Sequence, residues 1–257
     1  MIVLPDGTLY GLNFETLIAP KPSAHYWIEQ VTVTQAGALA LSPGGRPARK
    51  PAATGAPTLL LVGNPVAVSD AYPALAHAAA EIDGVSRHFD GHDRTILVGA
   101  SATPTAYAGA NPGRFSFIHF VAHGVASRAS PLDSVIVLSE NGRPAYVYAR
   151  DIVRTPLSAR LVTISACDSA GARTYSGEGL VGLSWAFLRA GAHQVVGALW
   201  QVDDASTARL MESLYDQIGA GRPPADAMRA AKLAMLKSGS VYRKPFYWAA
   251  FVLYSGV

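Results

Sequence analysis

Short apolar runs alternate with amphipathic stretches along most of this 257-residue chain. Runs of β-branched and aromatic residues bounded by glycine, proline or polar residues predict buried strands, and apolar residues at helical spacing predict helices. The predicted strands are residues 58–63, 95–99, 115–124, 161–167, 194–200 and 248–254, and the predicted helices are 73–88, 103–110, 178–190, 204–218 and 224–237. This alternation predicts an α/β fold, with a mostly parallel central sheet and helices on both faces.

The two ends of this pattern are less regular. Residues 1–4 and 26–33 are predicted as strands, and residues 134–148 as a β-hairpin around Asn141-Gly142. Residues 43–57 are rich in proline and glycine and hold no aliphatic side chain larger than alanine, which is typical of a linker. We therefore expect N-terminal strands and a linker over residues 1–57, and a core over residues 58–257.

Two of the predicted strands end in residues that are typical of a nucleophilic enzyme. Cys167, the only cysteine, ends the run LVTISAC, and His123 and Gly124 end the run FSFIHFVAHG. Ligands of open α/β sheets bind at the carboxyl ends of strands, so both side chains are expected at one crevice. An imidazole there can activate a thiol, and the Gly124 and Cys167 N–H groups can stabilise an oxyanion.

Each of these residues alone is more typical of a packed interior, because cysteine and histidine are often simply buried. Their joint occurrence at two strand ends, each before a small polar loop, favours function. His119 lies four residues before His123. On a strand the two would stand about 13 Å apart, too far to bind one metal ion. His119 is therefore predicted to be a core residue or a support for the site.

Acidic residues near these strand ends are candidates for substrate binding. Asp203 and Asp204 follow the predicted strand 194–200 and precede a helix. An aspartate at that position is commonly a helix N-cap. One of the pair can cap the helix while the other points into a pocket and binds a basic side chain. Asp168, next to Cys167, is a weaker candidate of the same kind.

Two further patterns resemble known motifs in letters only. Gly177, Gly179 and Gly182 form G-x-G-x-x-G, but dinucleotide binding needs these glycines directly after a strand. The segment Gly182–Ala186 resembles a serine nucleophile elbow, but it lacks the final glycine and falls within a predicted helix. We expect no cofactor and no metal ion.

Composition narrows the class of protein. The formal net charge of +3 arises from 21 basic and 18 acidic residues, too balanced a set to indicate a nucleic-acid partner. A single cysteine fits a reducing compartment. The N-terminus lacks the pattern of a signal peptide, and the most apolar long stretch, residues 179–200, holds charged and polar residues. We expect a cytoplasmic protein with no membrane partner.

Several segments in order along the chain resemble the CHAT domain, a caspase-like module associated with tetratricopeptide repeats. They are PDGTLYGLNFETL (5–17), HFVAHG (119–124), LVTISACDSAG (161–171), GEGLVGLSWAFLRAGAHQVVGALWQVDD (177–204) and YWAAFVLYSG (247–256). Asn13 stands where the family usually has proline, and Ser169 where it has threonine. The resemblance covers nearly the whole chain.

The resemblance implies a caspase-like three-layer sandwich and a cysteine endopeptidase with a Cys167/His123 dyad, assisted by Gly124. By similarity to separases, Asp204 would receive a basic P1 side chain. Ser165-Ala166-Cys167 departs from the Gln-Ala-Cys motif of true caspases, so aspartate specificity is not expected. Family members usually carry an N-terminal helical-repeat or sensor region, and the resemblance implies that this chain cleaves a specific protein partner in bacterial signalling or defence. The alternative is a catalytically idle docking or signalling module of the same family.

Overall fold

The computed structural model describes residues 1–5, 9, 11–36, 55–66, 69–127, 129–165, 178–201 and 203–256, and for residues 178–181 the backbone alone. Most of the predicted linker, residues 43–54, lies outside the described residues.

An eight-stranded sheet forms the centre of the molecule, in the order β1-β4-β13-β12-β11-β7-β5-β6. Every neighbouring pair is parallel except β12 with β13. The strands are β1 (Ile2–Val3), β4 (Thr34–Ala36), β5 (Leu59–Pro65), β6 (Arg94–Gly99), β7 (Phe117–Val121), β11 (Leu161–Ser165), β12 (Gln194–Ala198) and β13 (Phe251–Ser255). The central strands are buried on both faces, as their continuous apolar runs predict.

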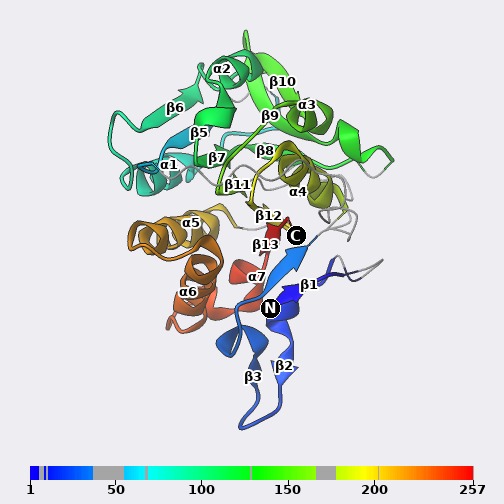
Figure 1. Ribbon diagram of the computed structural model, residues 1–257, viewed down its shortest axis with the longest axis vertical. Coiled ribbons are helices and arrows are strands. Elements are labelled where there is room, and N and C mark those ends of the chain that lie inside the picture. Colours follow the sequence, from blue (N-terminus) through cyan, green and yellow to red (C-terminus); the bar gives the residue numbers. More distant parts are fainter. Residues whose placement is uncertain are drawn as a thin grey trace.

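Helices cover both faces of this sheet (Figure 1). One hydrophobic core packs alternate strand residues against α1 (Ala78–Ser86), α5 (Asp204–Gly219), α6 (Pro224–Leu236) and α7 (Pro245–Trp248). The other core packs the remaining strand residues against α2 (Pro104–Gly109), α3 (Ala149–Arg154) and α4 (Glu178–Ala190). The predicted three-layer α/β sandwich is therefore confirmed. Within the described part of the chain, no helix is long and apolar enough to cross a bilayer.

A second, three-stranded sheet has the order β10-β9-β8, with β8 at His123–Val125, β9 at Val135–Glu140 and β10 at Arg143–Tyr148. The predicted hairpin is confirmed: Asn141 and Gly142 both have positive φ, at 52° and 71°, which is the backbone geometry of a two-residue hairpin turn. The predicted strand 115–124 is divided between β7 and β8, which belong to different sheets. His123 therefore lies where the chain leaves the central sheet.

The prediction of a strand at residues 26–33 is wrong. A small hairpin of β2 (Ile18–Ala19) and β3 (His25–Tyr26) is followed by a 3-10 turn, Trp27–Glu29. Two carbonyl groups that a strand would use in a ladder accept hydrogen bonds from Arg229 of α6 instead. Its Nε lies 2.7 Å from the Ile28 oxygen and its Nη2 lies 2.7 Å from the Glu29 oxygen. A tertiary contact from a helix about 200 residues away determines the local structure.

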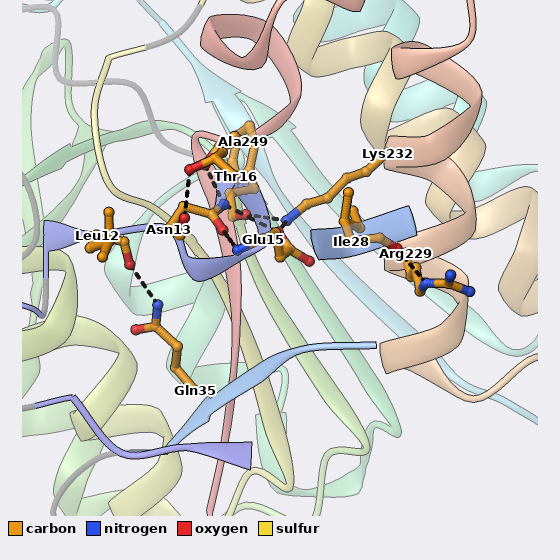
Figure 2. Close-up of polar contacts among 10 residues, drawn as sticks. Leu12, Asn13, Glu15, Thr16, Ile28, Gln35, Arg229, Lys232 and Ala249 are labelled. Carbon is orange, nitrogen blue, oxygen red and sulfur yellow. Dashed lines mark hydrogen bonds and ion pairs between the residues drawn. The ribbon is translucent and has the colours of Figure 1, made fainter. Parts of the chain in front are cut away.

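The N-terminal segment is held to α6 and β13 by a buried ion pair (Figure 2). Lys232 of α6 is fully buried, and its Nζ contacts Glu15 Oε2 and, at 2.6 Å, the Phe251 carbonyl oxygen. Asn13 caps the 3-10 turn Phe14–Thr16 through its side-chain oxygen, and its amide nitrogen lies 3.1 Å from Glu15 Oε2 and 2.6 Å from the Ala249 oxygen. Both charged groups of this buried pair, the Lys232 ammonium and the Glu15 carboxylate, thus have further polar partners besides each other.

Candidate active site

His123 lies at the end of the central strand β7, one residue beyond Val121-Ala122, and it begins β8. Its side chain is almost fully buried, with 3% exposed. The neighbouring strand β5 passes close to this point, because a Cβ on Gly63 would stand 2.4 Å from the Val121 oxygen. Gly124 follows in β8, opposite Ile136 of β9.

The ring of His123 has a defined orientation. Its Nε2 lies 2.8 Å from the carbonyl oxygen of Pro73, and the ring of Tyr72 lies 5.9 Å away between centroids. A carbonyl oxygen can only accept a hydrogen bond, so Nε2 carries the proton. In the neutral ring Nδ1 is then the basic nitrogen, the one able to take a proton from a nucleophile.

The predicted nucleophile, Cys167, and its neighbour Asp168 lie outside the described residues. The strand that leads to them is described. Ser165, the last residue of β11, is the register partner of Val121, the last residue of β7. Cys167 follows Ser165 by two residues, and His123 follows Val121 by the same number. The Ala122 N–H donates to the Ser165 oxygen at 3.3 Å.

The two aspartates at the start of α5 have different partners. Asp203 is the N-cap, and its Oδ2 accepts from the Ser206 N–H at 2.9 Å. Asp204 Oδ2 accepts from the backbone N–H of His77 at 2.7 Å. The sequence left open which of the two caps the helix, and the structure assigns the cap to Asp203. Asp204 faces the segment that precedes α1.

That segment explains why the predicted helix 73–88 begins five residues late, at Ala78. A helix that began at Pro73 would need a hydrogen bond from the His77 N–H to the Pro73 oxygen. Both groups have other partners, since the Pro73 oxygen accepts from His123 and the His77 N–H donates to Asp204. Residues 73–77 thus contact His123 and Asp204. The local sequence pattern gives no indication of these two contacts.

A small pocket lies against His123. Its lining comes from the end of β5, from residues 72–75 and from β9, and consists of Pro65, Val66, Tyr72, Pro73, Leu75, His123, Val137 and Leu138. The lining is apolar apart from the imidazole and the tyrosine hydroxyl. In the described part of the chain, acidic, histidine and cysteine side chains form no cluster of metal-ligand type.

The architecture is that of caspase-like cysteine peptidases. Separase from Saccharomyces cerevisiae, in its complex with securin, aligns with a TM-score of 0.56 and 16% identity over 89% of this chain and 14% of its own. Gingipain R (RgpB) of Porphyromonas gingivalis, an Arg-specific cysteine proteinase, aligns with a TM-score of 0.52 and 10% identity over 87% of this chain and 54% of its own. At these identities the likeness concerns the fold.

The family follows from the sequence as a whole. The model of the CHAT domain matches residues 1–256, so this chain belongs to the CHAT-domain family. Tetratricopeptide repeat protein 28 of Mus musculus is 32% identical over 111 residues, which are 43% of this chain and 4% of that protein. Its counterpart in Homo sapiens is 27% identical over 105 residues. The chain thus spans a small fraction of the length of these curated relatives.

Proposed function

We propose that this CHAT domain is a cysteine endopeptidase in which Cys167 is the nucleophile and His123 the base. The observation that carries the proposal is the register of β11 and β7. Their last residues, Ser165 and Val121, are paired, and the thiol and the imidazole each follow two residues later. The proton on His123 Nε2 supports the same assignment, because it makes Nδ1 the basic nitrogen.

In the proposed reaction, Nδ1 of His123 takes the proton of the Cys167 thiol, and the sulfur attacks the scissile carbonyl carbon. The carbonyl π electrons move to its oxygen, and the Gly124 N–H stabilises that oxyanion, worth about 3–4 kcal/mol for a well-aimed donor. Collapse of the intermediate breaks the C–N bond, and the imidazolium gives its proton to the leaving amine. Water, deprotonated by the same Nδ1, then hydrolyses the thioester and releases the acid.

We further propose that the substrate is a protein cut after a basic residue, with Asp204 as the acid that receives the P1 side chain. Gingipain R, which has a similar fold, is an Arg-specific proteinase, and this is consistent with the proposal. Asp168 is a second acid for the same pocket. A helical-repeat region preceding this domain agrees with the mouse relative, a tetratricopeptide repeat protein. A role in bacterial signalling or defence rests on the family resemblance alone, and a cytoplasmic location on the single cysteine, which fits a reducing compartment.

Covalent labelling tests the mechanism directly. Cys167 is the only thiol of the chain, so a peptide chloromethylketone with arginine at P1 is expected to alkylate that sulfur, and intact mass measures the adduct. We expect labelling that is lost in Cys167→Ala and falls at least about 100-fold in rate in His123→Ala. Cys167→Ala should keep the unfolding midpoint near that of the parent, and His123→Ala should lower it while still unfolding cooperatively, because it removes a buried, hydrogen-bonded side chain.

The idle module makes the opposite prediction. A chain that is not labelled under any activating condition, or is labelled equally with and without His123, would identify a docking domain of caspase-like fold. Cleavage that survives Cys167→Ala would exclude the thiol mechanism altogether.

A further inference from the structure

A buried chain of polar groups lies beneath the candidate active site, on the face covered by α1 and α5. His119 of β7, Glu81 of α1, Tyr215 of α5 and Thr163 of β11 are each at most 1% exposed. His119 Nε2 lies 2.9 Å from Glu81 Oε1 and His119 Nδ1 lies 3.2 Å from the Tyr215 hydroxyl, which lies 3.4 Å from Thr163 Oγ1.

One set of hydrogen-bond directions satisfies all four side chains of this network. Burial raises the pKa of Tyr215, so its hydroxyl keeps its proton at neutral pH. In the neutral His119 ring, Nε2 donates to the Glu81 carboxylate, and Nδ1 accepts from Tyr215. The tyrosine oxygen in turn accepts from Thr163. Every member is satisfied, and such a network is rigid where a partly satisfied one would be destabilising.

These buried polar groups lie on the same two strands that lead to the proposed dyad of His123 and Cys167. His119 and Thr163 are register partners on adjacent strands, and they precede His123 and Cys167 by four residues each. The strands themselves are already aligned by a ladder of five register pairs. Hydrogen bonds between side chains add little to the alignment of these two strands. Their main effect is to hold α1 and α5 against the sheet, because no backbone hydrogen bonds of a ladder join a helix to a sheet.

The position of helix α1 in turn affects the orientation of the His123 ring. Glu81 lies in its first turn, and residues 73–77 lead into it. The Pro73 carbonyl that holds His123 Nε2 is eight residues before Glu81, so the place of that oxygen depends on where α1 sits. At the other end of α1, Arg87 reaches Glu212 and Asp216 of α5 only through half-exposed ion pairs, which contribute little.

We infer that Glu81 and His119 are positioning residues, which hold α1 so that the Pro73 carbonyl fixes the tautomer and the orientation of the His123 ring. The inference rests on the proposed function only in giving His123 a role in the reaction. Neither residue touches the substrate or the reacting atoms. Their effect is to keep Nδ1 as the basic nitrogen and to aim it.

The test is the ring ¹⁵N spectrum of the 257-residue chain labelled at histidine, in which His123→Asn assigns the His123 signals. In the parent we expect the Nε2–H tautomer of His123 to predominate. In Glu81→Leu we expect this signature to be lost or averaged between tautomers. Glu81→Gln keeps an acceptor oxygen for His119 and should restore it. Arg87→Ala, which cuts the surface ion pairs of the same helix, should leave the signature unchanged.

A second variant covers the case in which Glu81→Leu does not fold, since it leaves His119 buried without its carboxylate. Glu81→Leu/His119→Leu leaves neither member of the pair unpartnered, and replacement of both partners by apolar residues is often tolerated. There too the His123 signature should be lost. A predominant Nε2–H tautomer in any folded variant without the Glu81–His119 bond overturns the inference.

Kinetics give an independent reading. If peptide cleavage is measurable, Glu81→Leu should lower kcat about tenfold or more with KM little changed, as expected for a misplaced catalytic group. The ring spectrum needs no substrate. Absence of Cys167 alkylation would therefore contradict the proposed function but not the positioning role. An unchanged His123 ring spectrum in the Glu81 variants would contradict the positioning role, even if the protein is an active peptidase.

Discussion

The carboxylate of Asp204 has two oxygens, and among the described residues one of them has a partner. Oδ2 accepts from the His77 N–H, which ties the start of α5 to the start of α1. A carboxylate oxygen pair offers about four lone-pair sites, so Oδ1 can still accept from a guanidinium or an ammonium group. Structural and substrate-binding roles are thus compatible in one side chain, and a substitution that keeps the shape can separate them.

Asp204→Asn is that substitution. The amide oxygen can still accept from His77, while the negative charge that would pair with a basic P1 residue is lost. We expect kcat/KM for arginine and lysine at P1 to fall at least about tenfold, because a charged hydrogen-bonded pair contributes about 1.5–3 kcal/mol. A P1-diverse peptide panel measures this, and the unfolding midpoint should change little.

Asp203→Asn is the matched control, because asparagine is as good an N-cap as aspartate and the charge change is the same. It should leave P1 selectivity unaltered. An equal loss for every P1 residue in Asp204→Asn would instead assign Asp204 to holding α1 alone.

At the scale of elements, the sequence predicts those helices and strands whose formation depends on local burial patterns and turn residues. The central strands follow from their apolar runs, and the β9–β10 hairpin from Asn141-Gly142. The errors fall where distant groups take over backbone hydrogen bonds. Arg229 binds the carbonyls of Ile28 and Glu29, and His123 and Asp204 take the two groups that would extend α1 to Pro73. The same limit applies to the site: motifs indicate His123, but no motif identifies a backbone carbonyl that orients it.

The ion pair between Glu15 and Lys232 ties the N-terminal segment to α6 in the interior of the protein. Lys232→Met leaves the Glu15 carboxylate, 5% exposed, without its cation. Removing one partner of a buried pair costs about 3–5 kcal/mol, which for a chain of this size lowers Tm by about 10 °C. Differential scanning calorimetry measures the change, and Glu15→Met/Lys232→Met should recover most of it.

Arg150→Met serves as the control for that experiment, since it breaks an ion pair with Asp133 whose side chains are 43% and 50% exposed. Its cost should stay below about 1 kcal/mol. A loss in Lys232→Met no larger than in Arg150→Met would show that the buried pair contributes nothing beyond a surface one.

At the scale of the whole molecule, the N-terminal strands belong to the same sheet as the candidate site. β4 pairs with β13, which pairs with β12, and β12 pairs with β11, the strand that leads to Cys167. Ile28, fully buried, joins the core beneath α5 and α6. The division at residue 57, which the proline-rich linker suggests, therefore separates segments of sequence that share one sheet and one core.

A chain reduced to residues 58–257 should consequently be much less stable than the full chain, although it keeps every candidate site residue. Truncation exposes the edge of β13, removes the carbonyls bound by Arg229 and leaves buried Lys232 without a carboxylate, which alone costs about 3–5 kcal/mol. We expect a broad unfolding transition at a lower temperature, measured by circular dichroism. Lys232→Met in the truncated chain should recover part of the loss, because it removes the unpaired charge. A truncated chain that unfolds cooperatively at the temperature of the full chain would show that residues 58–257 are an autonomous domain.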